Sequence, residues 1–275
     1  MREKKKSFME QFIKINDVKI NYEIHNELRS ECLLFIHGNS SDLKSFSNLF
    51  NHPALKNYKL IALDLPGHGR SDRLTVYTLN KMTDIIASFC KQLGLNDVHL
   101  VGHSFGGHLG IRTLHKHLFK SIYLCSTPPL IPEYFRYAFN PHENAGALFS
   151  ETASEEKLAK LMVEFGHKGD DLKYHIKSYY NTDPRFRIDL SNECLRPDFE
   201  NEFAVLEASK TFAHFLICKN DNLVNNNYIL DFCANNEMIS VSTIFAGHCP
   251  VNEKTNEFVS DLILFIEKMR FKARN

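Results

Sequence analysis

The sequence predicts an α/β fold in which a mostly parallel, twisted sheet is flanked by helices on both sides. Residues 12–25 alternate apolar and polar side chains about Asn16-Asp17, as an antiparallel hairpin with one covered face does. Short, continuously apolar runs then recur along the chain, and such runs are typical of parallel strands that are buried on both faces. Segments with helical periodicity separate these runs, which is the order of elements that builds a sheet covered by helices.

The individual elements follow from these patterns. The apolar runs place six strands after the hairpin, at residues 32–36, 60–63, 98–101, 122–125, 212–217 and 239–244. Residues 79–93 are predicted to form a helix, because their apolar side chains recur on one face and Gly94 stands where a helix ends. A last amphipathic helix is predicted from Glu253 to about Lys272.

Residues 127–200 interrupt the alternation of strand and helix. They hold no convincing buried strand, but residues 155–166 and 170–180 have helical periodicity. A connection of about 70 residues without elements would be unusual in a compact domain. We therefore expect a helical cap at 127–200, inserted at the carboxyl edge of the sheet, where α/β proteins bind ligands. Residues 1–126 and 201–275 are expected to form the two parts of the core.

The composition of the chain limits which binding partners and which cellular compartment we expect. The 33 basic and 33 acidic side chains among 275 residues balance, so no net field attracts nucleic acid or an anionic membrane. The chain has neither the apolar region of a secretory signal near its start nor a membrane-spanning run, and stable membrane association is not expected. The seven cysteines are odd in number and contain no C-x-x-C pair, which indicates reduced thiols and a cytoplasmic protein.

One motif carries a candidate nucleophile. Gly102-His103-Ser104-Phe105-Gly106-Gly107 matches G-x-S-x-G, follows the apolar run 98–101 and precedes a helix-compatible segment at 108–117. In a strand–turn–helix setting this pattern forms a sharp turn that exposes the serine hydroxyl. The helix that starts after Ser104 also directs its N-terminal N–H groups towards developing negative charge.

A serine hydroxyl is a weak nucleophile near neutral pH and needs a base and a group that orients the base. His248 is the predicted base, because it follows the strand at 239–244 on the edge where Ser104 emerges. Asp221 follows the strand at 212–217 in the same way and is the predicted acid, 27 residues before His248. Asp231 and Asp198 are weaker candidates for this acid, since Asp231 falls on a helix and Asp198 in the expected cap.

An oxyanion formed by attack of Ser104 requires backbone N–H donors. The N–H of Phe105, directly after the serine, is one predicted donor, and Asn39 in the loop after the strand at 32–36 is the other, with Ser40 in reserve. His37 and His103 are expected to brace these loops rather than to move protons.

Four segments resemble the signature blocks of the α/β-hydrolase superfamily. They are His37-Gly38-Asn39-Ser40, Asp64-Leu65-Pro66-Gly67-His68-Gly69-Arg70-Ser71-Asp72, the Ser104 motif and Gly247-His248. The D-x-P-G-x-G-x-S form is similar to that of the capped members. The resemblance implies that Asp64 and Asp72 belong to a structural loop. Cys218 stands where the family's G-x-x-D block usually has glycine.

This resemblance implies a serine hydrolase that acts on a small, largely apolar ester, thioester or related acyl substrate. Haloalkane dehalogenases and epoxide hydrolases of this fold have aspartate at the position of Ser104 and are excluded. Thioesterases, carboxylesterases, lactonases, C–C hydrolases or lyases, proline iminopeptidases and haloperoxidases stay open, as does a ligand-binding or signalling protein with slow turnover. We expect no cofactor and no metal, because His115 and His117 diverge on a helix and no phosphate-binding glycine loop occurs.

Overall fold

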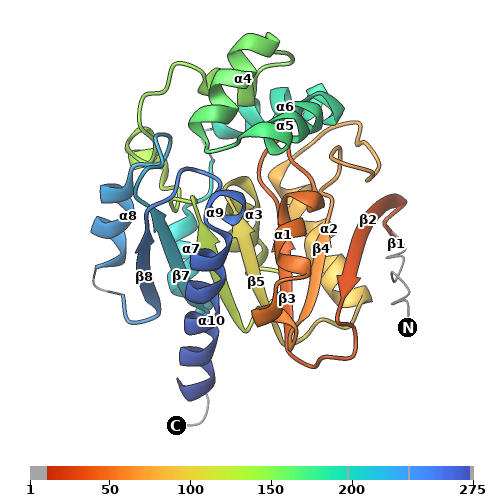
Figure 1. Cartoon of the computed structure of the whole chain (residues 1–275), viewed down its shortest axis with the longest axis vertical. Helices are drawn as coiled ribbons and strands as arrows, with labels where there is room; N and C mark the ends of the chain where they lie inside the picture. The colour runs from red at the N-terminus through yellow and green to blue at the C-terminus, as the bar shows by residue number, and fades with distance from the viewer. Residues whose placement is uncertain (1–10, 197, 235, 273–275) are drawn as a thin grey trace.

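A computed structural model describes residues 11–196, 198–234 and 236–272; the start of the chain, where the sequence predicts no secretory signal, lies outside them. An eight-stranded sheet with the order β1-β2-β4-β3-β5-β6-β7-β8 forms its centre (Figure 1). β1 (Gln11–Ile15) and β2 (Val18–His25) form the predicted hairpin, and β2 is antiparallel to β4. The remaining six strands run parallel to one another: β3 (Cys32–Ile36), β4 (Lys59–Leu63), β5 (Val98–His103), β6 (Ser121–Cys125), β7 (Phe212–Cys218) and β8 (Ile239–Ile244). The predicted fold class is confirmed.

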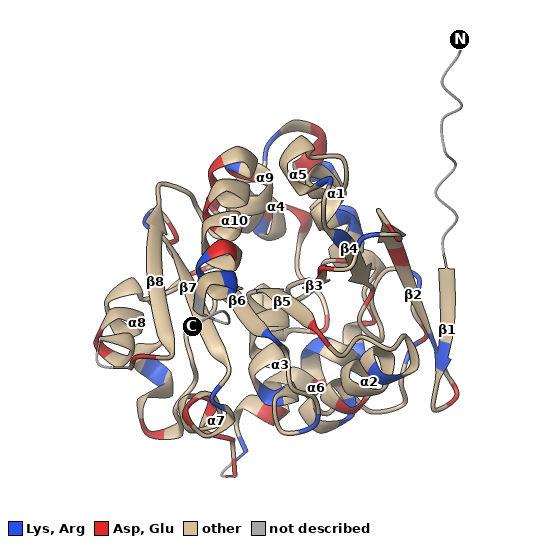
Figure 2. Cartoon of the chain, turned by 90° about the horizontal axis from the view of Figure 1, so that it is seen from below, with Lys and Arg blue, Asp and Glu red and all other residues tan. Residues whose placement is uncertain are grey.

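Helices cover both faces of this sheet, as the view along it shows (Figure 2). One apolar cluster joins the sheet to α2 (Leu79–Gln92), α3 (Phe105–Thr113), α7 (Glu202–Ser209) and α8 (Asn226–Cys233). A second cluster joins the opposite face to α1 (Ser47–Phe50), α9 (Pro250–Glu253) and α10 (Thr255–Lys272). Along β3, Leu34 belongs to the first cluster and Leu33 to the second, so the strand is apolar throughout because both of its faces are buried.

Local sequence signals set the ends of several elements. Asn16 and Asp17 both have positive φ, at 46° and 69°, as a two-residue hairpin turn of type I′ requires. The Thr78 hydroxyl accepts a hydrogen bond from the N–H of Lys81 and starts α2. α3 spans 105–113 rather than the expected 108–117, because its start is fixed by the turn at Ser104 and its apolar face ends before the polar stretch at 115–117.

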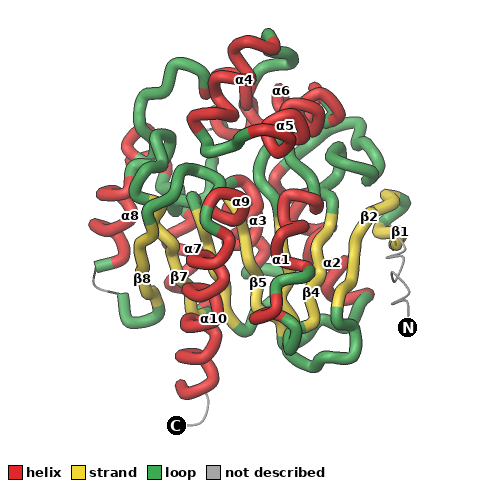
Figure 3. The backbone as a smooth tube through the Cα atoms, in the orientation of Figure 1, coloured by secondary structure: helices red, strands yellow, loops and turns green. Residues whose placement is uncertain are grey.

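Residues 127–200 fold into helices that lie above the carboxyl ends of the strands (Figure 3). α4 (Glu155–Glu164) and α5 (Gly169–Asn181) correspond to the two helical patches in the sequence. α6 (Pro184–Cys194) was not anticipated, although Asp183 caps it and Pro184 occupies its first turn, which is a recognisable start signal. Short 3₁₀ helices also occur, at Pro132–Tyr137 and Ala145–Phe149 in this segment and at Leu43–Phe46 and Pro53–Leu55 earlier in the chain.

The surface and the thiols are unremarkable in their chemistry. Acidic and basic side chains are interspersed around the molecule (Figure 2). None of the helices in the described part of the chain combines the length and apolarity that a membrane span requires. All seven cysteines are free, six are buried, and Cys194 is half-buried.

Gly106 illustrates how closely the elements approach one another at the start of α3. A Cβ atom on Gly106 would lie 2.1 Å from the carbonyl oxygen of Ile36 in β3. We expect Gly106→Ala to lower the free energy of unfolding by about 3 kcal/mol, because backbone must move to accept the methyl group. Gly146→Ala is the control, since its Cβ would approach only the end of Lys157 at 3.9 Å. Urea unfolding of both variants measures the difference, and equal stabilities would contradict the expectation.

Candidate active site

Ser104 lies on the turn between β5 and α3. Its backbone angles, a φ of 50° and a ψ of −120°, are rarely adopted by residues other than glycine, so the turn is strained. The turn exposes the serine hydroxyl at the end of the sheet. A Cβ on Gly102 would lie 2.5 Å from the Cα of Gly107. Glycine at this position therefore permits the close crossing of strand and helix.

The structure brings the three residues chosen from the sequence into one hydrogen-bonded chain. His248 Nε2 lies 3.1 Å from Ser104 Oγ, and His248 Nδ1 lies 2.9 Å from Asp221 Oδ2. Asp221 follows β7 and His248 follows the neighbouring parallel strand β8, which explains why residues 27 positions apart meet at one sheet edge. His248 and Asp221 are both buried. The Asp221 carboxylate can accept a hydrogen bond from Nδ1–H of His248, and this tautomer leaves Nε2 free to accept the serine proton.

The environment of Asp221 favours its ionised form. Burial alone would raise the pKa of Asp221, but the charge and hydrogen bond of His248, with the N–H groups of Leu223 and Val224, lower it below its ordinary value. The two weaker choices lie elsewhere: Asp198 pairs with Arg196 at the surface, and Asp231 is on α8. The cysteine at 218 leaves this turn intact, since its carbonyl accepts the N–H of Asp221 at 3.0 Å.

Two further side chains hold the backbone of His248. His103 Nε2 and Ser126 Oγ donate to its carbonyl oxygen at 2.8 and 2.9 Å. Burial lowers the pKa of His103 to about 3, so this imidazole stays neutral and its role is that of a donor. The Phe165 ring lies 4.5 Å from the imidazole of His248, between ring centres. The bracing role predicted for His103 has a direct structural counterpart, whereas no sequence motif identified Ser126 or Phe165.

The predicted oxyanion donors lie beside Ser104. Phe105 is the first residue of α3, so its N–H lacks an acceptor within the helix. The Asn39 amide donates to the carbonyl of Leu148 at 2.8 Å and accepts from Ser40 Oγ at 2.7 Å, which fixes the orientation of this loop. His37 Nε2 accepts the N–H of Leu65 at 3.0 Å, as expected of a residue that braces the loop. The assignment of the oxyanion donors stays a prediction.

The loop at 64–72 is a structural element. The Asp64 carboxylate accepts hydrogen bonds from the side chain of Asn21 and the N–H groups of Leu43 and Arg70, at 2.7 to 2.8 Å. A Cβ on Gly69 would lie 2.2 Å from that carboxylate. Asp72 accepts the N–H of Lys19 at 2.9 Å. These contacts give both carboxylates a structural role, and neither needs a catalytic one to explain its position.

Two cavities meet at Ser104. The smaller, of about 40 Å³, is bordered by His248, Phe165, His167 and His175. The larger, of about 220 Å³, is lined mostly by apolar side chains. Of the aromatic residues in 127–200, Phe135, Phe139, Phe149 and Phe199 line the larger cavity, while Tyr179 is buried and Tyr134, Tyr137 and Tyr180 are exposed. Asn39 and Leu148 border both cavities with Ser104.

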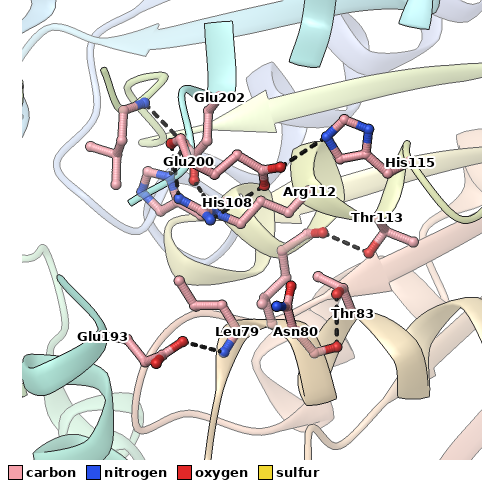
Figure 4. A network of polar contacts seen from close by, with 12 residues as sticks. Leu79, Asn80, Thr83, His108, Arg112, Thr113, His115, Glu193, Glu200 and Glu202 are labelled. Carbon is pink, nitrogen blue, oxygen red and sulfur yellow. Dashed lines mark hydrogen bonds and ion pairs between the residues drawn. The ribbon is translucent and has the colours of Figure 1, made fainter. Parts of the chain in front are cut away.

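A buried polar network borders the larger cavity (Figure 4). Glu202 is fully buried, and its carboxylate accepts from His108 Nδ1 at 2.8 Å, from Arg112 Nε at 2.7 Å and from the N–H of Leu130 at 2.9 Å. The Arg112 guanidinium also lies 4.3 Å from the centre of the Phe199 ring. Burial alone would raise the pKa of Glu202, but the charges of His108 and Arg112 outweigh burial and lower it.

We expect Glu202→Gln to lower the free energy of unfolding by about 3 kcal/mol, because Arg112 loses the charge that balances it in a buried site. Since the pKa of Glu202 is depressed in the fold, its contribution is present above its ordinary value of 4.5 and is lost as the pH falls further. The variant should therefore also lose less stability than wild type on acidification. Glu207→Gln, at an exposed position of the same helix, is the control. Denaturant unfolding at pH 7 and pH 4 tests both effects, and a variant as stable as wild type would contradict them.

The sequence analysis expected no metal ligands. Among the described residues, however, His167, Asp171 and His175 place one potential ligand atom each within 4.8 Å of one another. The spacing of Asp171 and His175 was a readable signal, because residues four apart lie on one helix face, and His167 lies just before the same helix.

Comparison with known proteins identifies the family. A model of the alpha/beta hydrolase family matches residues 33–262. The chain is 40% identical over 99 residues to the dihydrolipoyllysine-residue acetyltransferase component of the acetoin cleaving system of Cupriavidus necator, a match that spans 35% of this chain and 26% of that protein. It is 31% identical over 134 residues to the uncharacterised hydrolase YugF of Bacillus subtilis, over 46% of this chain and 48% of the relative. The matched segments thus cover less than half of these relatives.

Solved structures share the whole fold at low identity. A mutant of the N-acyl homoserine lactonase AidH, complexed with N-hexanoyl homoserine lactone, superposes with a TM-score of 0.85 at 21% identity, and the match covers 95% of this chain and 98% of that one. An esterase from Exiguobacterium antarcticum superposes with a TM-score of 0.78 at 19% identity and covers 94% of this chain and 100% of its own. From the extent of the family match, the chain belongs to the alpha/beta hydrolase family.

Proposed function

We propose that this protein is a serine hydrolase of small acyl substrates, with Ser104 as nucleophile, His248 as general base and Asp221 as the orienting acid. The observation that carries the proposal is the hydrogen-bonded chain from Asp221 through His248 to Ser104, placed where an apolar cavity opens. The family and the esterases and lactonases among its structural neighbours agree with a hydrolase.

Acylation begins when Ser104 Oγ attacks the carbonyl carbon of the substrate and its proton passes to His248 Nε2. Asp221 stabilises the imidazolium that results. The N–H groups of Phe105 and Asn39 are the proposed donors to the oxyanion, and each such donor contributes roughly 3 kcal/mol of barrier lowering in comparable sites. The tetrahedral intermediate collapses as His248 returns the proton to the leaving oxygen or sulfur, which departs as an alcohol or thiol.

Deacylation repeats these steps with water. His248 Nε2 accepts a proton from the water that attacks the acyl carbon, and the second tetrahedral intermediate expels Ser104 Oγ, which regains the proton. The acid product then leaves. The braces on the His248 carbonyl from His103 and Ser126 keep the imidazole within reach of both partners through these proton transfers.

The cavities indicate the substrate class. We propose that the larger cavity accepts an apolar acyl chain and that residues 127–200 act as a cap over it. Phe135, Phe139 and Phe149 from this segment line that cavity, which supports an apolar substrate. The lactone bound by AidH carries a hexanoyl chain, which is an apolar acyl chain as well. Free and mostly buried thiols agree with the reducing conditions of the cytoplasm, which we propose as the location.

Hydrolysis of p-nitrophenyl esters with acyl chains of two to sixteen carbons tests this proposal. We expect turnover with a higher kcat/KM for medium chains than for the longest, because the cavity holds only about 220 Å³ and the charged Arg112 and Glu202 are part of its lining. Labelling by a fluorophosphonate probe should accompany turnover. Ligand-dependent thermal stabilisation without turnover or labelling would instead indicate a binding or signalling protein. Turnover confined to C–C bond substrates would indicate a C–C hydrolase or lyase.

A further inference from the structure

A compact group of metal-binding side chain types lies at the smaller cavity, outside the proposed catalytic chain. His167 precedes α5, and Asp171 and His175 follow at intervals of four residues along that helix. His167 Nδ1 is 2.6 Å from Asp171 Oδ2, and His175 Nε2 is 3.5 Å from Asp171 Oδ1. Both histidines are buried and the carboxylate is half-buried. Two imidazoles and a carboxylate are a donor set typical of zinc and related divalent ions.

The geometry of the imidazoles suits coordination. The rings of His167 and His175 stack with their centres 3.7 Å apart and their planes inclined by 27°. Both rings place a nitrogen near the Asp171 carboxylate, so the three side chains converge on one point. Imidazole nitrogens and carboxylate oxygens that converge in this way can share one metal ion. The side-chain amide nitrogen of Asn252 lies 3.2 Å from His175 Nε2, so Asn252 adjoins the same imidazole nitrogen.

Asn252 connects the group to another part of the chain. Its amide nitrogen lies 2.7 Å from Asp171 Oδ1, and a rotation about the last side-chain bond would exchange that nitrogen for the amide oxygen, a metal ligand. Asn252 belongs to α9, four residues after His248. A metal ion held here would therefore tie α5 to the loop that carries His248.

The position adjoins the reaction centre. His167, His175 and Asn252 line the smaller cavity together with Ser104 and His248. We propose that His167, Asp171, His175 and Asn252 form a binding site for one divalent transition-metal ion of the zinc type, which links α5 to α9 at the edge of the smaller cavity. The site does not take part in the proposed transfer of protons between Ser104 and His248.

Titration of the chelator-treated protein with ZnCl₂ in a calorimeter tests the site. Wild type should bind one equivalent, and saturation should raise the midpoint of thermal unfolding by about 5 °C, because the ion binds only the folded arrangement. Asp171→Asn, which keeps the size of the side chain, and His175→Ala should each weaken binding by roughly 100-fold and abolish the thermal shift.

Two control variants separate this site from others. His115→Ala removes an exposed histidine that pairs with Glu200 on another surface, and it should bind zinc as wild type does. Ser104→Ala should also bind normally, because the serine is not a ligand. The proposal is overturned if wild type binds no stoichiometric zinc, or if both Asp171→Asn and His175→Ala bind it as tightly as wild type. Unfolding curves of the metal-free variants establish that each one folds.

Discussion

Ser104→Ala is expected to reduce kcat for ester hydrolysis by roughly 10⁴- to 10⁶-fold, the range found when a triad serine is removed. The methyl group that replaces the hydroxyl cannot form the acyl-enzyme, and what remains is binding and oxyanion stabilisation of direct attack by water. Initial rates with a p-nitrophenyl ester measure the loss. Labelling by a fluorophosphonate should disappear in the same variant, because the probe phosphonylates this oxygen.

The matched control is Ser260→Ala on α10. Ser260 is exposed, and its hydroxyl donates a hydrogen bond to the carbonyl of Asn256 within its own helix. Activity and labelling should both equal those of wild type. If Ser104→Ala were labelled as strongly as wild type, a different residue would be the nucleophile. Thermal unfolding of Ser104→Ala should show a folded protein, because the hydroxyl makes no contact that the fold depends on.

Asp221→Asn is expected to lower kcat by roughly 10⁴-fold while leaving the fold intact. The amide that replaces Oδ2 would donate to His248 Nδ1, and the imidazole would then carry its proton on Nε2. In that tautomer it cannot accept the proton of Ser104. The retained oxygen can still accept the N–H groups of Leu223 and Val224, so the turn after β7 should persist.

Asp231→Asn provides the comparison for this acid. Asp231 is the nearby carboxylate on α8, and its replacement should change kcat by less than about twofold, since it lies outside both cavities at Ser104. Rates for the two variants at one pH, with unfolding curves beside them, complete the test. Loss of activity in Asp231→Asn equal to that in Asp221→Asn would remove the assignment of the acid.

Much of the fold was readable from the sequence because the relevant signals are local. A strand buried on both faces must be apolar at successive positions, so β3 to β7 stand out as short apolar runs. β8 is less buried and polar at alternate positions, but its apolar residues still led to its prediction as one of these runs. The boundaries of α3 and the existence of α6 were missed, because a start set by a strained turn or by a cap has a weaker pattern than a long apolar face.

The sequence by itself determined the family blocks, the candidate serine and histidine, and the acid that strand order places beside them. Tertiary structure alone decided what surrounds these residues. The hydrogen bond from His103 to the carbonyl of His248 joins positions 145 apart, and Asn252 reaches Asp171 across 81 positions. Contacts of this kind leave no periodic pattern, because they depend on how the chain between them packs rather than on neighbouring residues. The lining of the cavities, and with it the choice of substrate, also depends on how residues far apart in the sequence pack together.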